Sequence, residues 1–359
     1  MRAAQNVRAV REDLMKKLVQ SLSALGLSTA IMIGCGDSSL YAQSTNDPNA
    51  APNPYRMEEF PLQLPDDRKL GAPIGVEIDH SDGKTLWIFE RCGGDSCAGS
   101  AVDPVMKLDA SGKMVANFGG GLTNWPHGFY VDRAGNVWIT DGRGENGKGH
   151  TVIKFSPQGK ILLTLGKPGQ AGNAPGMFDM PSDVITTPDG DIFVADGHGV
   201  FEGHQSNDRI VKLSKDGTFI TTWGKHGSAP GEFDVPHSLA MDSAGRLYVG
   251  DRSNSRIQIF DQSGKFIVEW KQFGRPSSVY IDNNDTIYVA DSQSDDKTNP
   301  GFKQGIRIGS VKDGKVLAFI PLIDAAIGPS EELAADDQGN VFAGFTAKGK
   351  MAVRKFVKN

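Results

Sequence analysis

The chain has 359 residues, including 44 glycines and 19 prolines, and its 38 basic and 43 acidic residues leave a net charge of −5. This many turn-forming residues argues against a helix bundle, and a hydrophobic content of 38% argues against a disordered chain. A net negative chain lacks the basic surface that nucleic-acid binding requires, so no nucleic acid is expected as a partner. The expected class is a turn-rich β protein.

Residues 1–35 have the pattern of an export signal. A second methionine, Met15, is followed by a pair of lysines and by an apolar run that ends at Cys35, which is the three-part order of a signal peptide. Met15 is therefore the expected start of the protein. Two cleavage sites stay open, a lipoprotein site at Cys35 or an ordinary signal-peptidase site in residues 40–43. A permanent membrane helix fits less well because the run is short and interrupted by polar residues.

Residues 36–65 are rich in Asn, Pro, Asp and Ser and are expected to form a flexible tether. The mature protein is expected to be exported, either periplasmic, with or without a lipid anchor, or secreted. That N-terminal lipid would be its one attachment to a membrane. In such an oxidising compartment, Cys92 and Cys97 are expected to close a small disulfide loop. A thiolate metal cluster is not expected, since the third cysteine lies in the export signal.

One pattern recurs along the rest of the chain: a proline, an apolar alternation, an acidic residue, a turn and a second alternating run. The copies begin at Pro73, Pro126, Pro181, Pro236 and Pro276, with a degenerate sixth at Ser330. Most copies are followed by two further runs, which predicts four antiparallel strands per repeat. Because one such sheet leaves both faces exposed and six can close a ring, the sequence predicts an all-β, six-bladed β-propeller over residues 66–359. Residues 66–72 would help to close the ring.

The residue after each initial proline is expected on one rim of the central channel. Around the ring, side chains able to bind a metal fall in the second, fourth and sixth copies, at His127, His237 and Glu331. Groups about 120° apart converge on one point, and two imidazoles with a carboxylate can hold Zn²⁺ or another divalent transition metal with positions left open for a substrate. The alternative is that both histidines only cap loops after proline.

The same rim receives the residues that follow the second run of each copy. Arg91 and Arg252 lie there and favour a small anionic or peptide-like substrate, because a guanidinium fits a carboxylate in two-point geometry. Salt bridges with rim carboxylates are their alternative role. His198 precedes a longer loop that could cover the channel mouth. Arg209 and Arg256 recur at one repeat position, which favours a structural role.

Residues 233–261, FDVPHSLAMDSAGRLYVGDRSNSRIQIFD, resemble an NHL-repeat propeller and are closely similar to a blade of the peptidyl-α-hydroxyglycine α-amidating lyases. The similarity runs from about Pro73 to the C-terminus. In that family three histidines hold a catalytic zinc. The resemblance carries two of them onto His127 and His237 and puts Glu331 at the position of the third.

The same resemblance extends to other site residues. The family's substrate-gripping arginines correspond to Arg91 and Arg252, and its active-site tyrosine corresponds to His198. The family also has a structural Ca²⁺ held largely by backbone oxygens in the channel, which loosely implies a set at Val76, Phe129 and Glu332.

The resemblance implies a lyase reaction. The metal would bind the hydroxyl of an α-hydroxyglycine-like carbinolamide and lower its pKa, a base would take the proton, and cleavage of the C–N bond would give an amide and glyoxylate. Arg91 or Arg252 would hold the substrate carboxylate, and His198 would accept the proton because its unperturbed pKa lies near neutrality. A carboxylate ligand at Glu331 would make the metal a weaker Lewis acid than three imidazoles would, which implies a shifted substrate.

Two other functions stay open. One is a non-catalytic exported NHL propeller that binds a peptide, glycan or protein on its rim, since a fold does not settle a function. The other is a metal-dependent hydrolase of a lactone or similar ester. A monomer is expected in each case.

Overall fold

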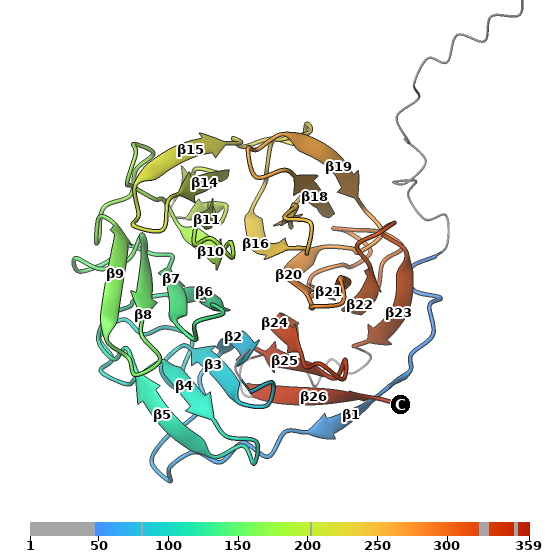
Figure 1. Ribbon diagram of the computed structural model, residues 1–359, viewed down its shortest axis with the longest axis horizontal. Coiled ribbons are helices and arrows are strands. Elements are labelled where there is room, and N and C mark those ends of the chain that lie inside the picture. Colours follow the sequence, from blue (N-terminus) through green and yellow to red (C-terminus); the bar gives the residue numbers. More distant parts are fainter. Residues whose placement is uncertain (1–46, 80–81, 202, 323–329, 348–350) are drawn as a thin grey trace, which may run out of the picture. The chain divides into compact units, whose positions relative to one another are not determined.

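The protein forms six four-stranded antiparallel sheets arranged around a central axis, as Figure 1 shows for the computed structural model. The described residues are 47–79, 82–201, 203–322, 330–347 and 351–359. In these parts of the chain there is no helix, and so none that could cross a membrane. The six-bladed propeller predicted from the repeats is confirmed. The predicted export signal and its two cleavage sites lie outside the described residues.

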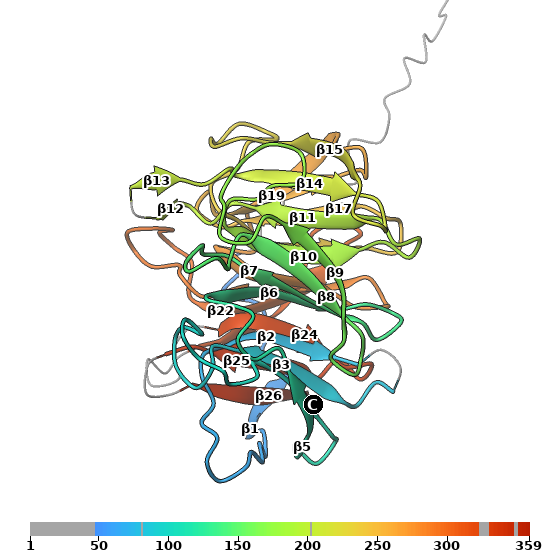
Figure 2. The ribbon, with the colours of Figure 1, turned by 90° about the vertical axis from the view of Figure 1, so that its left-hand side faces the viewer.

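In the first five blades the strands follow chain order from the axis outwards, and the sixth blade takes its outermost strand from the N-terminal side. Blades one to three are β2 (Pro73–Ile78), β3 (Leu86–Glu90), β4 (Val105–Leu108) and β5 (Met114–Phe118); β6 (Pro126–Val131), β7 (Val137–Asp141), β8 (Thr151–Phe155) and β9 (Ile161–Gly166); β10 (Pro181–Thr186), β11 (Ile192–Asp196), β14 (Arg209–Leu213) and β15 (Phe219–Trp223). Blades four and five are β16 (Pro236–Met241), β17 (Leu247–Asp251), β18 (Arg256–Phe260) and β19 (Phe266–Trp270); β20 (Pro276–Ile281), β21 (Thr286–Asp291), β22 (Gly305–Ser310) and β23 (Val316–Pro321). Blade six is β24 (Ser330–Ala335), β25 (Val341–Phe345), β26 (Ala352–Lys358) and β1 (Tyr55–Glu59), and a small hairpin, β12 (Val200–Phe201) and β13 (His204–Gln205), projects from blade three (Figure 2).

Apolar side chains from neighbouring blades form a separate core at each of the six blade interfaces. Between blades one and two, for example, Phe89 stacks on Phe129 with ring centroids 5.5 Å apart. The second strands are buried along their whole length, apart from the half-buried Thr286 at the start of β21, whereas outer strands such as β15 and β5 alternate between half-buried and exposed residues. The inner strands are covered on both faces because blades stack face to face, so the channel is fixed by the packing of whole blades.

The ring is closed by a strand from the N-terminal side of the propeller. β1 pairs antiparallel with β26, from Tyr55 opposite Lys358 to Glu59 opposite Arg354, and forms the outer edge of blade six. The sequence assigned these residues to a tether and placed ring closure at residues 66–72. The difference arises because β1 is a short outer strand with one buried residue. Its few apolar side chains do not form a recognisable strand pattern within a polar segment.

Candidate metal centre

A bulge at the start of each blade directs one side chain toward the channel. The pairing of first and second strands is irregular just after the initial residue in all six blades, as between Pro236 and Ser238 in blade four. The residue left out of the ladder in blade four is His237, and in blade six it is Glu331. In blade two the irregularity spans His127. Bulges re-aim side chains, so the repeated irregularity accounts for the rim position predicted from sequence.

Buried carboxylates at the ends of the second strands fix the turns that precede these bulges. Asp141 accepts hydrogen bonds from the backbone amides of Asn124 and Trp125, at 2.9 and 2.7 Å. Asp251 does the same for Asp234, at 2.8 Å, and also pairs with Arg256 at 2.7 Å. Both aspartates are fully buried. The turns that lead to the histidines are thus held by bonds in a low-dielectric interior, where they are strong.

The structural role expected for two arginines agrees with this arrangement. Arg256 donates to Asp251, and Arg209 donates to the equivalent Asp196 at 2.9 Å. Each guanidinium also donates to carbonyl oxygens of the loop before the first strand of its own blade. Their contacts therefore stabilise the turns rather than the channel rim itself.

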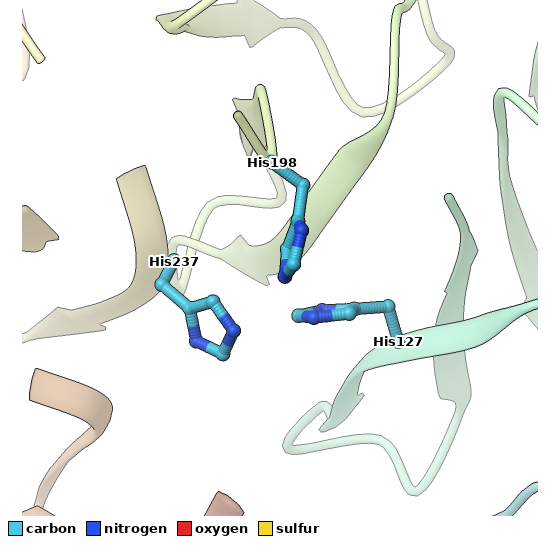
Figure 3. A group of neighbouring side chains, drawn as sticks. All are labelled: His127, His198 and His237. Carbon is cyan, nitrogen blue, oxygen red and sulfur yellow. The ribbon is translucent and has the colours of Figure 1, made fainter. Parts of the chain in front are cut away.

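Three imidazoles from neighbouring blades meet at the rim, as Figure 3 shows. His127 comes from β6, His237 from β16, and His198 from the loop after β11, and one ring nitrogen of each lies within 4.8 Å of the other two. Their ring centroids are 4.5 to 5.1 Å apart. Of the described residues, these three form the group of nitrogen, sulfur or carboxylate donors compact enough for a single metal ion. Three imidazoles with open positions are a donor set for a catalytic zinc site.

Hydrogen bonds to the backbone fix the tautomer of two of the rings. His127 Nδ1 lies 2.7 Å from the carbonyl oxygen of Ser182, and His237 Nδ1 lies 2.6 Å from that of Ser277. A carbonyl can only accept, so each Nδ1 carries the proton and each Nε2 presents a lone pair. Metal-binding histidines are oriented in this way by an acceptor on the opposite ring nitrogen. His237 Nε2 is buried and makes no hydrogen bond, so its lone pair is available to a metal.

The environment keeps the imidazoles neutral. Burial holds the pKa of His127 and of His198 well below the ordinary value, and neighbouring rings and Arg91 lower both further. The pKa of His237 is also lowered, first by burial and then by Arg252. Neutral imidazole is the form that binds metals, so the three rings are available as ligands at neutral pH.

Glu331 lies beside the imidazoles and contacts two cationic or metal-binding groups. Its Oε1 is 3.2 Å from His237 Nε2 and 3.5 Å from Arg252 Nη1. Despite burial, the positive charge of Arg252 lowers the pKa of Glu331 below its usual range, so the group is an anion. Since His237 donates through Nδ1, the 3.2 Å contact brings two acceptor atoms together. A cation between or beside them would relieve that contact.

The arrangement differs from the sequence prediction in the third donor. The prediction gave that place to Glu331 and gave His198 the part of proton acceptor, whereas the compact donor group contains His198. The prediction of ligands in alternate blades used only residues at the start of the first strands. In blade three the first strand offers only the small Ser182, whose hydroxyl is bonded to the Pro236 carbonyl, and the ring of His198 enters from the loop after the second strand.

Arg91 and Arg252 lie at the same rim and already have partners. Arg91 donates through Nε to the Pro126 carbonyl at 3.1 Å and through Nη1 to Asp95 at 2.8 Å, and its guanidinium stacks on Trp125 at 4.4 Å. Arg252 contacts Glu331, and its Nη2 lies 3.4 Å from His198 Nε2. Each arginine therefore lies at the rim of the histidines and also forms a salt bridge, which was its alternative role.

The residues loosely implied for a structural Ca²⁺ follow the rim positions by one or two residues in the first strands of three blades. Val76 is in β2, Phe129 in β6 and Glu332 in β24. Burial and repulsion from Asp183 raise the pKa of Glu332 and of Glu77 well above the usual value, and Glu77 Oε2 is buried without a partner. Oxygen donors of this kind suit a hard cation. The Ca²⁺ stays a prediction.

Comparisons with known proteins agree with the fold and with the resemblance to amidating lyases. The family model for the NHL repeat matches residues 233–260. Human NHL repeat-containing protein 3 is 40% identical over 131 residues, which are 35% of this chain and 36% of that protein. Peptidyl-alpha-hydroxyglycine alpha-amidating lyase 1 of Drosophila melanogaster is 36% identical over 143 residues, which are 37% of this chain and 24% of the lyase.

The chain thus covers about a third of the human protein's length and about a quarter of the fly lyase's. Among solved structures, a gluconolactonase from Xanthomonas campestris superposes with a TM-score of 0.56 at 16% identity, over 88% of this chain and 93% of that one. A streptogramin B lyase superposes at 0.52, also at 16% identity, over 85% and 98%. These similarities bear on the fold alone. The chain is a six-bladed β-propeller with an NHL repeat, and it resembles the peptidyl-α-hydroxyglycine α-amidating lyases in sequence.

Proposed function

We propose that this protein is an exported, metal-dependent lyase that cleaves the C–N bond of an α-hydroxyglycine-like carbinolamide to an amide and glyoxylate. The observation that carries the proposal is the rim cluster of three neutral imidazoles, two of them buried and that of His198 half-buried, in which His237 Nε2 has no hydrogen-bond donor. The sequence similarity to amidating lyases supports the reaction class. The disulfide between Cys92 and Cys97 supports export, since such bonds persist in oxidising compartments.

His127, His198 and His237 would hold Zn²⁺ or another divalent transition metal. A bound metal of this kind supplies Lewis acidity, which lowers the pKa of a substrate hydroxyl. The Nδ1–H bonds of His127 and His237 to backbone carbonyls hold the rings in place for this task. Burial of the cluster excludes water and strengthens electrostatic interactions with the substrate.

The charged neighbours would orient the substrate. Arg91 retains an edge of free N–H groups for the substrate carboxylate, as its contacts use Nε and one hydrogen of Nη1. Glu331 is an anion beside His237 and would accept a hydrogen bond from the substrate hydroxyl. A carboxylate with so low a pKa is a weak base, so Glu331 suits orientation better than storage of a proton.

One observation favours a second candidate, a metal-dependent lactone or ester hydrolase. Glu331 lies 3.5 Å from Arg252 and already offers it a carboxylate. An arginine neutralised in this way binds a substrate anion less strongly, which suits an uncharged ester. A lyase would then rely on Arg91 alone for its substrate carboxylate.

Metal analysis of the purified full chain tests the metal centre first. We expect about one equivalent of a divalent transition metal in the wild type and much less in His127→Ala and His237→Ala. His226→Gln serves as the control, because His226 lies half-exposed against Asp208 outside the cluster. Wild-type protein that takes up no metal even after incubation with Zn²⁺ would exclude both enzyme candidates and leave a binding platform.

Activity then separates the two enzymes. Release of glyoxylate from α-hydroxyhippurate, a small α-hydroxyglycine amide, supports the lyase, and it should disappear in His237→Ala. Opening of a γ- or δ-lactone without release of glyoxylate supports the hydrolase instead. The lyase proposal fails if metal-loaded wild type releases no more glyoxylate than His237→Ala does.

A further inference from the structure

A disulfide loop from blade one lies against the candidate metal centre. The loop runs from Cys92 to Cys97 directly after β3, and its two cysteines are bonded to each other. Asp95 is inside the loop, and its Oδ1 lies 2.8 Å from Arg91 Nη1. The side chain of Asp95 is 78% exposed, whereas that of Arg91 is 10% exposed. An exposed carboxylate is thus held over the outer side of a buried guanidinium.

The other end of the loop is attached to blade two. The backbone amide of Cys97 and the hydroxyl of Ser96 both donate to the carbonyl oxygen of Asn124, at 2.8 and 3.0 Å. Asn124 begins the turn that leads to His127, and Asp141 fixes that turn from within. The loop therefore joins the arginine of blade one to the turn before a metal-binding histidine of blade two.

Arg91 is held on three sides as a result. Asp95 takes one hydrogen of Nη1, the Pro126 carbonyl takes Nε–H, and the ring of Trp125 covers one face of the guanidinium. Trp125 in turn packs against His127 and His198, with ring centroids 4.9 Å away in each case. The N–H groups that remain belong to Nη2 and to the second hydrogen of Nη1, so the orientation of the guanidinium decides whether they are presented to a substrate.

An ion pair with so exposed a carboxylate holds a side chain weakly by itself. Closing the loop restricts where Asp95 can go, and this lowers the entropy lost when the pair forms. Two contacts to Asn124 restrict the loop further. The covalent link and the ion pair consequently act together on Arg91.

We propose that the Cys92–Cys97 loop is a positioning element, in which Asp95 holds Arg91 in the orientation that grips an anionic substrate. The part of the proposal that concerns substrate rests on the proposed function. Opening the loop or removing Asp95 weakens the grip on the anion and leaves metal binding intact, because His127 and His237 keep their own bonds to Ser182 and Ser277.

The orientation of Arg91 can be tested without any activity assay. The full-length double variant Cys92→Ser/Cys97→Ser and wild type are treated with phenylglyoxal, which modifies accessible guanidiniums, and the labelling of Arg91 and Arg252 is followed by peptide mass spectrometry. Arg252 is the internal reference, since it lies at the same rim without touching the loop. We expect the labelling rate of Arg91 to rise about threefold or more, the factor that corresponds to loss of an ion pair, with that of Arg252 unchanged.

Single variants at Asp95 keep the disulfide and extend the test to a protein whose loop stays closed. Asp95→Ala should raise the labelling of Arg91, and Asp95→Glu should restore most of the protection. If Arg91 is labelled at the wild-type rate in both the double variant and Asp95→Ala, or if Arg91 and Arg252 become reactive together, the loop does not position Arg91 and the proposal is overturned.

Kinetics with α-hydroxyhippurate provides the second readout. In Asp95→Ala we expect KM to rise by about the same factor of three or more. The kcat and the metal content should stay at the wild-type values. A fall in kcat or loss of metal would indicate general damage and would overturn the positioning role. If wild type releases no glyoxylate, the lyase proposal fails, while the labelling of Arg91 still decides the proposal about the loop.

Discussion

Two layers of the channel lie one residue apart along the same strands, and they use polar side chains in opposite ways. In the rim layer, His127 and His237 each donate to a carbonyl of the next blade and keep one ring nitrogen free for other chemistry. In the deeper layer, side chains accept backbone N–H groups of the next blade. Asp183 accepts from Leu239 at 2.7 Å, Ser238 from Val279 at 3.0 Å, and Ser278 from Leu333 at 3.4 Å. The deeper layer ties blades together, and the rim layer keeps capacity for a ligand.

Burial drives the pKa values of the two layers in opposite directions toward the same neutral state. It lowers the pKa of the rim imidazoles, it raises that of Asp183 to about 7, and it raises those of Glu77 and Glu332 well above their usual value. Glu331 is the exception, because the positive charge of Arg252 stabilises its anion. Charge is therefore retained in the hub where a cationic partner is in place, which makes the rim the layer suited to charged substrates.

The largest effect is expected from removing a rim imidazole. His237→Ala should lower glyoxylate release by more than about a hundredfold and abolish metal binding, since even residues that only support a metal ligand commonly matter tenfold to a hundredfold. The free energy of unfolding of the metal-free protein should fall only by about 0.5–1.5 kcal/mol, the usual contribution of one hydrogen bond, because the fold loses the Nδ1–H bond of His237 to the Ser277 carbonyl. Activity assays, metal analysis and calorimetry of the metal-free proteins measure these outcomes.

A large loss of stability in metal-free His237→Ala would contradict the division into layers. It would mean that the bond from His237 to the Ser277 carbonyl, rather than a metal, is what the rim histidine provides. His226→Gln is again the matched control, as it removes an imidazole that lies outside the hub.

A smaller effect, and one confined to stability, is expected from the titration of Asp183. Burial raises its pKa from 3.8 to about 7, so the folded chain binds more protons than the unfolded chain between these values. The free energy of unfolding should then fall as the pH rises from about 4 to about 7, with a slope from this group of up to about 1.4 kcal/mol per pH unit. Asp183→Asn should remove that part of the slope.

Urea unfolding of the metal-free protein across this pH range measures the slope. Asp216→Asn is the control, because Asp216 is fully exposed and its pKa is lowered, so it titrates below the window. A slope in Asp183→Asn equal to that of wild type would show that Asp183 is already ionised in the folded protein over this pH range.

The propeller was predictable because repetition supplies the same information six times. The strand pattern after Pro126, Pro181 and Pro236 is clear in each copy, and one copy can be weak, as at Ser330, without loss of the whole. β1 was missed because it occurs once and has one buried residue. A strand that only completes an edge takes its conformation from its partner rather than from its own pattern.

The candidate site was predictable in part for a related reason. The position after each proline repeats, so His127 and His237 could be placed at one rim from sequence. The direction of His198 depends on the loop after β11, where the hydroxyl of Ser206 holds the amides of His198 and Gly199 at 2.9 and 3.0 Å. That loop carries the hairpin of β12 and β13, which has no counterpart in the described parts of the other blades. Its course is set by tertiary contacts, which a local pattern does not contain.

The smallest effect, and the closest comparison of the two layers, comes from neighbours in one strand. Ser238→Ala removes the acceptor of the buried Val279 amide and should cost about 1–3 kcal/mol of unfolding free energy. Metal content and kcat should match wild type, although His237 is the adjacent residue. Ser263→Ala, in an exposed turn, controls for loss of a hydroxyl in general. If Ser238→Ala released the metal as His237→Ala does, the two layers would be one coupled unit. The orientation of His237 for a metal would then depend on the hydrogen bonds of the deeper layer, such as that from Val279 to Ser238.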